Sequence, residues 1–165
     1  YGLFRTPNTA LAAQRERMEM IRLLIADDHE HLRATLRELL EREPDIEIVA
    51  EACDGEQAVA LAGQLLPDLV LMDIAMPVLD GIETTRLIVE RHPGVKVLAY
   101  SSHLERRLVR QMLAKGALGY INKGASRSEL LRAVRSVAAG QSFLCEETTA
   151  LMAQVGPMSQ YMPLN

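Results

Sequence analysis

Short apolar runs alternate with helical stripes five times between residues 21 and 140. Each run is apolar almost throughout, which is typical of a strand buried on both faces of a parallel sheet. Each stripe repeats apolar residues at three- and four-residue spacing, which is typical of an amphipathic helix. The expected strands begin at Ile21, Ile46, Leu69, Val95 and Leu118. This alternation predicts an α/β fold in which a doubly wound, five-stranded parallel sheet has helices on both faces.

Polar residues at the expected helix starts support these boundaries. A short polar side chain before a helix can accept a hydrogen bond from a free backbone N–H, and a Glu or Gln three residues later completes the motif. Such pairs are Asp54 with Gln57, Asp80 with Glu83, and Ser126 with Glu129. Gly116 is expected to end the fourth helix. Beyond Gly140 we expect a short extension over residues 142–144 and a helix over residues 146–155.

Polar side chains gather at the expected carboxyl ends of four strands. Asp27 and Asp28 follow the first strand, Asp73 the third, Ser101 the fourth and Lys123 the fifth. Open α/β sheets bind their ligands in the crevice outside these strand ends. If the strand order is 2-1-3-4-5, as in flavodoxin-like folds, the first and third strands are neighbours, and the three carboxylates share one crevice.

Three carboxylates in one crevice repel one another, and a hard divalent cation relieves that repulsion. Mg²⁺ suits a site made of carboxylates, a backbone carbonyl and waters. A carboxylate beside such a cation can attack a phosphoryl group, while Ser101 and Lys123 bind the phosphoryl oxygens from the other side. Taken singly, the acid pair is a helix cap, Ser101 a turn residue and Lys123 a surface charge. The hypothesis therefore depends on their joint placement.

Composition and charge narrow the functional classes. Hydrophobic residues make up 48% of the chain and charged residues 24%, as in ordinary globular domains. The net charge of -4 gives no basic face, so the chain itself is not expected to bind nucleic acid. Cys53 and Cys145 have no metal-ligand spacing, and no apolar run is long enough for a membrane helix. We therefore expect a cytoplasmic protein with reduced thiols and no membrane contact.

Residues 20–140 resemble the receiver domain of bacterial response regulators, the CheY-like domain of two-component systems. The resemblance rests on the acidic pair within residues 25–29, the block at 71–77 with Asp80 and Gly81, the Ser101 position, and the stretch at 116–123. Lys123 is followed by Gly124, where the broader receiver pattern has proline. The Asp-Asp-His sequence and the stretch after residue 137 are most similar to the LuxR-type (NarL/FixJ) regulators.

The resemblance implies a role for each residue at the strand ends. Asp73 would accept a phosphoryl group from a sensor histidine kinase, and Lys123 would bridge to the phosphoryl oxygens. Ser101 and Tyr120 would be the switch pair, in which the hydroxyl moves onto the phosphate and the ring turns inward. The implied Mg²⁺ ligands are Asp28 and Asp73 directly, Asp27 through water, and the backbone carbonyl of Ala75. His29 and His103 are expected to border the crevice without a catalytic role.

The resemblance also suggests a domain plan and partners. Residues 1–19 are expected to be a leader or tag, residues 20–140 the receiver domain, and residues 141–165 a linker helix and tail. LuxR-type regulators carry a helix-turn-helix domain after such a linker, and too few residues follow here to form one. Either the sequence stops short of that domain, through which DNA would then be bound, or the protein never had one. Phosphorylation would change a partner surface or a homodimer surface.

Two other functions use related parts. A Mg²⁺-dependent phosphohydrolase with an aspartyl nucleophile shares the chemistry, but it is expected to carry an acid–base residue two places after the nucleophile, where this chain has Ala75. A nucleotide-binding domain would need a Gly-rich phosphate loop after the first strand, and the sequence has none there. We therefore expect a phosphorylation-dependent signalling switch rather than an enzyme.

Overall fold

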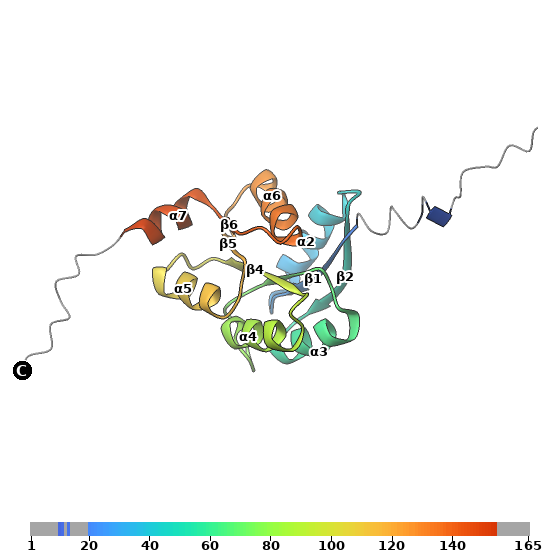
Figure 1. Cartoon of the computed structure of the whole chain (residues 1–165), viewed down its shortest axis with the longest axis horizontal. Helices are drawn as coiled ribbons and strands as arrows, with labels where there is room; N and C mark the ends of the chain where they lie inside the picture. Colours follow the sequence, from blue (N-terminus) through green and yellow to red (C-terminus); the bar gives the residue numbers. More distant parts are fainter. Residues whose placement is uncertain (1–9, 12, 14–19, 155–165) are drawn as a thin grey trace, which may run out of the picture.

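The structure is a computed structural model that describes residues 10, 11, 13 and 20–154. Strands and helices alternate along residues 21–153 (Figure 1). Their bounds are β1 Ile21–Ala26, α2 Glu30–Glu41, β2 Ile46–Ala52, α3 Gly55–Leu65, β3 Leu69–Met72, α4 Gly81–Arg91, β4 Lys96–Ser101, α5 Arg106–Ala114, β5 Gly119–Asn122, α6 Arg127–Ala138, β6 Phe143–Leu144 and α7 Glu146–Ala153. Most of the expected leader (1–19) and the last part of the expected tail (155–165) lie outside the described residues.

One parallel sheet holds all these strands in the order β2-β1-β3-β4-β5-β6. The predicted order 2-1-3-4-5 is confirmed, but the predicted count of five strands is wrong. A sixth strand, β6, pairs Phe143 with Gly119 and Leu144 with Tyr120 at the edge of β5. Two residues are too few to display the periodicity by which a strand is recognised in a sequence, so only the tertiary pairing defines β6.

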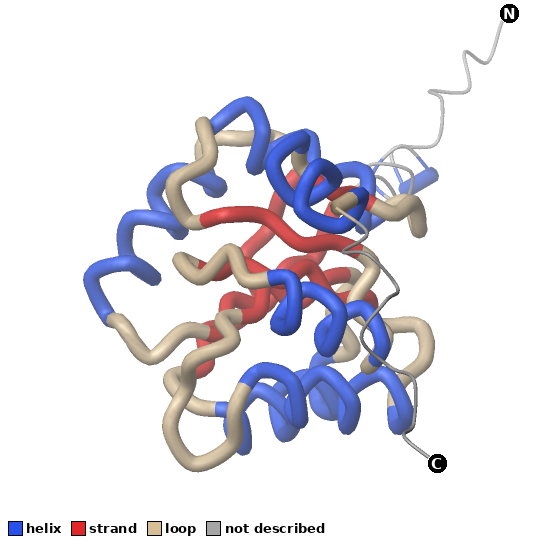
Figure 2. Tube along the Cα trace, turned by 90° about the vertical axis from the view of Figure 1, so that its left-hand side faces the viewer, coloured by secondary structure: helices blue, strands red, loops and turns tan. Residues whose placement is uncertain are grey.

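Helices cover both faces of the sheet, as the alternation predicted (Figure 2). The β1 residues Leu24 and Ala26 face one apolar cluster, which contains buried residues of α3, α4 and α5. Leu23 and Ile25 face the other cluster, which contains buried residues of α2 and α6. Successive strand residues therefore point into opposite layers, and both layers are filled. None of the helices in the described part of the chain combines the length and hydropathy that crossing a bilayer requires.

The predicted helix ends are confirmed by their hydrogen bonds. The caps are Asp54 Oδ1 with the Gln57 N–H at 2.8 Å, Asp80 Oδ1 with the Glu83 N–H at 2.9 Å, and Ser126 Oγ with the Glu129 N–H at 3.2 Å. Gly116 follows α5 with a φ of 107°, which favours glycine. The adjacent Ala117 N–H donates to the Met112 carbonyl at 3.0 Å, so the chain leaves the helix in a Schellman-type turn.

Candidate functional site

β1, β3, β4 and β5 are neighbours whose carboxyl ends lie at one edge of the sheet, and the group of Asp27, Asp28, Asp73 and Lys123 gathered there is called the crevice below. Asp27 directly follows β1 and Asp73 directly follows β3. The Asp27 N–H donates to the Ala52 carbonyl at 3.1 Å, and the Asp73 N–H donates to the Ala26 carbonyl at 2.9 Å. Backbone hydrogen bonds between neighbouring strands therefore hold both acids at the same edge.

Lys123 links the two acids from the end of β5. Its Nζ lies 2.7 Å from Asp27 Oδ2 and 3.2 Å from Asp73 Oδ1. Only 2% of the Asp27 side chain and 4% of the Asp73 side chain are exposed, against 15% for Lys123. A buried charge is tolerated when it is paired and hydrogen-bonded, so this ammonium group is what makes two buried carboxylates compatible with the fold.

Asp28 and His29 form the outer rim of the crevice, and both residues are exposed. His29 Nδ1 lies 3.1 Å from Asp27 Oδ1 and 3.0 Å from Asp28 Oδ1. The His29 N–H also donates to Asp27 Oδ1 at 2.8 Å. One ligand atom from each of Asp27, Asp28, His29 and Asp73 lies within 4.8 Å of all the others. The sequence predicted that His29 borders the crevice, and the structure adds its contact with both carboxylates.

Burial and mutual repulsion set the protonation equilibria of the crevice. Burial, and then the charge of Asp27, raise the pKa of the Asp73 carboxyl, and the Lys123 ammonium offsets only part of this rise. Burial alone would lower the pKa of Lys123, but its hydrogen bonds and charge pairing with Asp27 and Asp73 outweigh burial and raise it. Lys123 therefore stays charged. The three carboxylates of Asp27, Asp28 and Asp73 outnumber this one lysine.

The donor set fits a hard divalent cation. Three carboxylates supply oxygen ligands and a surplus of negative charge, the two features that Mg²⁺ sites use. Ala75, the predicted carbonyl ligand, lies in the loop after β3, and its N–H donates to Asp73 Oδ1 at 3.4 Å. This bond places the Ala75 backbone beside the Asp73 carboxylate. The ligand roles themselves stay predictions.

The two predicted switch residues, Ser101 and Tyr120, both form hydrogen bonds with the backbone of His103. Ser101 Oγ accepts a hydrogen bond from the His103 N–H at 3.0 Å. The Tyr120 hydroxyl donates to the His103 carbonyl, and the ring is fully buried. Burial is also the main reason that the pKa of Tyr120 is raised. The ring is thus turned inward, and one short loop connects it to the Ser101 hydroxyl.

The loop between β3 and α4 has little room beneath Asp73. Gly81 donates its N–H to the Ile74 carbonyl at 2.8 Å. A Cβ at Gly81 would lie 2.0 Å from the Asp73 carbonyl oxygen, closer than atoms can approach. In the same loop Val78 is 74% exposed and has a φ of 67°, which is strained for a β-branched residue. Close packing of α4 therefore holds this loop at the crevice.

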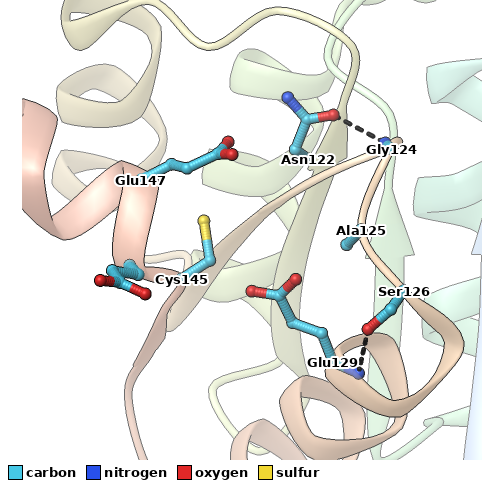
Figure 3. A pocket seen from close by; sticks show the side chains of 8 residues that line it. Asn122, Gly124, Ala125, Ser126, Glu129, Cys145 and Glu147 are labelled. Carbon is cyan, nitrogen blue, oxygen red and sulfur yellow. Dashed lines mark hydrogen bonds between the residues drawn. The ribbon is translucent and has the colours of Figure 1, made fainter.

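A separate cleft of about 390 Å³ lies between the loop that joins β5 to α6 and the start of α7 (Figure 3). Asn122 and Gly124, the two neighbours of Lys123, line it together with Cys145 and Glu147 at the start of α7. None of the residues predicted to form the site lines this cleft. Three glutamates also line the cleft, but the buried acids with converging ligand atoms and a bound lysine lie in the crevice, so the crevice is the better candidate for chemistry.

Two supporting contacts were not predicted from the sequence. Arg33 Nη1 donates to the Asp27 carbonyl at 2.7 Å, and the Tyr100 hydroxyl donates to the Lys123 carbonyl at 3.2 Å. Arg33 has the pattern of a solvated helix residue, and Tyr100 that of a buried strand residue. No spacing signal distinguishes them, because each contact depends on how separate elements pack.

Comparison with known proteins gives one consistent result. The profile of the response regulator receiver domain family matches residues 23–135. The chain is 40% identical over 129 residues to the transcriptional regulatory protein DegU of Brevibacillus brevis, covering 78% of this chain and 55% of DegU. It is 38% identical over 146 residues to the response regulator UvrY of Escherichia coli K12, covering 87% of this chain and 67% of UvrY. The chain thus spans between about half and two thirds of the length of these relatives.

Solved structures agree with the sequence relatives. The crystal structure of a LuxR-family two-component response regulator from Aurantimonas sp. SI85-9A1 superimposes with a TM-score of 0.78 at 31% identity. The match covers 81% of this chain and 96% of that one. The family match over residues 23–135 therefore includes β2 to β5, most of β1 and the acids and lysine of the crevice.

Proposed function

This chain belongs to the response regulator receiver domain family of two-component systems, and on that premise we propose that Asp73 is its phosphoacceptor. Its relatives are LuxR/NarL-type response regulators. The observation that carries the proposal is the buried Asp73 carboxylate, held 3.2 Å from the Lys123 ammonium and beside two further acids. Neighbouring elements bring this carboxylate, the Lys123 ammonium and two further carboxylates together, and these are the groups that the proposed transfer requires.

The reaction proposed is a single phosphoryl transfer. A carboxylate oxygen of Asp73 attacks phosphorus, one oxygen–phosphorus bond forms, and the bond from phosphorus to the leaving group of the donor breaks. The leaving group takes its proton from solvent, and nothing is oxidised or reduced. Lys123, which contacts both acids before transfer, then binds a phosphoryl oxygen and offsets the added negative charge.

Asp27, Asp28, Asp73 and the Ala75 carbonyl are the proposed ligands of Mg²⁺. The family uses Mg²⁺ at an acidic pocket, and the acid cluster of this chain supplies such a pocket. When bound, the ion supplies charge neutralisation between the nucleophile and the phosphoryl oxygens. The Arg33 bond to the Asp27 carbonyl holds the backbone of that acid in place for it.

Ser101 and Tyr120 are proposed to report the phosphorylation. The Ser101 hydroxyl would leave the His103 N–H and donate to a phosphoryl oxygen. The loop at His103 would follow, and the Tyr120 hydroxyl would keep the ring inward through its bond to the His103 carbonyl. Phosphorylation would then favour one of two loop arrangements and change the surface around α5.

The partners proposed for the whole protein follow from its relatives. A sensor histidine kinase would supply the phosphoryl group, and a homodimer would form or change on phosphorylation. DegU is described as a transcriptional regulatory protein, so we propose a role in transcription in which α7 begins the linker to a DNA-binding helix-turn-helix domain. We propose the cytoplasm as its location, where Cys53 and Cys145, both free thiols here, would stay reduced.

Treatment with a small phosphodonor and Mg²⁺ tests the proposal. Intact-mass measurement is expected to find one phosphate added per chain, and the Asp73→Asn variant is expected to add none. Chelation of the divalent cation serves as the control and is expected to suppress the reaction. Gel filtration with beryllofluoride, a mimic of the phosphorylated carboxylate, tests the dimer in the same sample.

The result also separates the switch from a phosphohydrolase. A receiver domain adds one phosphate and stops, whereas a hydrolase turns over many equivalents of a phosphate ester. Family membership favours the receiver domain, and Ala75 offers no proton-transfer group two residues after Asp73. Phosphate uptake that survives Asp73→Asn, or sustained ester turnover, would contradict the proposal.

A further inference from the structure

The backbone of Lys123 is fixed on both sides by consecutive residues of β4. Its N–H donates to the Ser101 carbonyl at 2.9 Å. Its carbonyl accepts the hydroxyl proton of Tyr100 at 3.2 Å. Ser101 also carries the hydroxyl proposed to bind phosphate. The end of β4 therefore supplies one of the two proposed phosphoryl-binding groups and fixes the backbone of the other, Lys123. Tyr100 itself has no assigned role.

The Tyr100 ring also lies beside the charged end of the same lysine. Its centroid is 5.9 Å from Lys123 Nζ, within the range of a cation–π contact. Tyr100 is 7% exposed and belongs to the apolar cluster that contains Ile25 and Leu71. These two residues lie in β1 and β3, the strands that Asp27 and Asp73 directly follow. Tyr100 therefore contacts Lys123 at both ends: its hydroxyl at the backbone and its ring near the ammonium.

The loop after Lys123 depends on hydrogen bonds for its shape. Gly124 donates its N–H to Asn122 Oδ1 at 2.7 Å, as Figure 3 shows, and Ala125 donates to the Asn122 carbonyl at 3.0 Å. Glycine permits many backbone conformations, so Gly124 does not itself fix the position of the preceding carbonyl. The Tyr100 hydroxyl restrains that carbonyl from the other side of the loop.

We infer that Tyr100 is a positioning residue for phosphoryl transfer, which places Lys123 to bind the phosphoryl group on Asp73. This role rests on the proposed function of Asp73. Tyr100 does not touch the phosphoryl group and does not lie among the metal ligands. Its loss therefore weakens binding of a phosphoryl group or its mimic, and leaves binding of the metal alone unchanged.

The Tyr100→Phe variant removes the hydroxyl and keeps the buried ring. Thr85→Val is the matched control, because it also removes one buried hydroxyl, which donates to a carbonyl of its own helix, Gly81, at 2.6 Å. Two quantities are measured for each protein: the affinity for Mg²⁺ alone by calorimetry, and the beryllofluoride concentration that half-saturates the Mg²⁺-loaded protein. Phosphorylation by the small phosphodonor is followed by intact mass.

For Tyr100→Phe we expect half-saturation by beryllofluoride to rise about two- to tenfold, the effect of one hydrogen bond. The affinity for Mg²⁺ is expected to stay within about twofold of wild type, and Thr85→Val to match wild type in both quantities. Tyr100→Leu, which also removes the ring, is expected to weaken beryllofluoride binding further.

Failure of the inference and failure of the proposed function give different results. If wild type adds no phosphate, or Asp73→Asn adds it, the assignment of Asp73 fails and the positioning role fails with it. If wild type is phosphorylated on Asp73 while Tyr100→Phe binds beryllofluoride as Thr85→Val does, only the positioning role is overturned. An equal loss of Mg²⁺ and beryllofluoride affinity in Tyr100→Phe also overturns it, because that pattern indicates general damage to the crevice.

Discussion

Two clusters of charged side chains use the same chemical groups in opposite ways. The surface cluster consists of Glu43, Asp45, Arg127 and Arg135, and joins the turn between α2 and β2 to α6. Its two acids meet two arginines at 2.6 to 2.8 Å, and both arginine side chains are more than 40% exposed. In the crevice cluster Asp27 and Asp73 are buried and share one lysine, while the third acid, Asp28, is exposed at the rim.

Burial and surplus charge distinguish a charged functional site from a charged surface. An exposed cluster whose acids and bases balance adds a little stability and needs no bound ligand. A buried cluster with surplus negative charge costs stability, and a fold keeps it only where something else relieves that charge. The pKa shifts of one acid in each cluster have opposite directions, as this difference requires. Hydrogen bonds from Arg135 lower the pKa of Asp45, whereas burial raises the pKa of Asp73.

Removal of the shared lysine is expected to have the largest effect. Lys123→Met removes the cation that two buried carboxylates share, and we expect a loss of about 3 kcal/mol in the free energy of unfolding at neutral pH. Without Lys123 the pKa of Asp73 would be raised further, so the loss is largest at high pH and shrinks as Asp73 protonates on acidification. Chemical denaturation between pH 5 and pH 8 without metal measures this. A pH-independent loss would contradict the account.

Crowding of the loop under Asp73 is expected to have the second largest effect. Gly81→Ala places a Cβ where the Asp73 carbonyl lies, and we expect a loss of about 2 kcal/mol as the loop shifts. Gly94→Ala is the matched control, since a Cβ there has no atom within 4 Å. Thermal unfolding compares the two. If both variants unfold at the same temperature, the close packing at Gly81 has no energetic importance.

The same Asp to Asn change is expected to have opposite signs in the two clusters. Without divalent cations at pH 7, Asp73→Asn should stabilise the fold by about 1 kcal/mol, because it removes a buried, repelled charge. Asp45→Asn should destabilise it by less than about 1 kcal/mol, as for an exposed ion pair. Denaturation curves of both variants, measured side by side, decide this. Losses of equal size would mean that the clusters do not differ in kind.

Acid removes both effects, and this gives a control within the same experiment. The folded pKa of Asp73 is raised, so its penalty is present above the folded pKa and disappears below the unfolded value near 3.9. The folded pKa of Asp45 is lowered, so its contribution is present above the unfolded value and is lost as the pH falls through the folded pKa. Each variant should therefore approach wild-type stability in acid.

Added salt is expected to have the smallest effect on stability and to weaken only the ion pairs of the surface cluster. A rise in NaCl from about 0.1 M to about 1 M shortens the screening length from roughly 10 Å to roughly 3 Å. We expect the coupling between Asp45 and Arg135, measured in a double-mutant cycle, to fall by a few tenths of a kcal/mol. The coupling between Asp27 and Lys123 should hold at both salt concentrations. A coupling in the crevice that is equally salt-sensitive would mean that water reaches these side chains.

The convergence of Asp27, Asp73 and Lys123 could be predicted from the sequence once the strand order of flavodoxin-like folds was assumed. These residues end strongly apolar strands, and parallel strands bring their carboxyl ends to one edge, so periodicity locates them at that edge. β6 was missed because two residues show no period. Tyr100 and Arg33 were missed because their contacts join elements far apart in the chain, and such contacts depend on side-chain packing that no local pattern encodes.

The central claim is that the surplus charge of the crevice serves phosphoryl transfer to Asp73. Its most direct test is to phosphorylate the protein with Mg²⁺ and a small phosphodonor, reduce the acyl phosphate with borohydride, and locate the modified residue by peptide mass spectrometry. Reduction of the side chain at position 73 to an alcohol, dependent on Mg²⁺, is the expected result. Reduction at another aspartate, or none in a sample that has gained phosphate, would contradict the account.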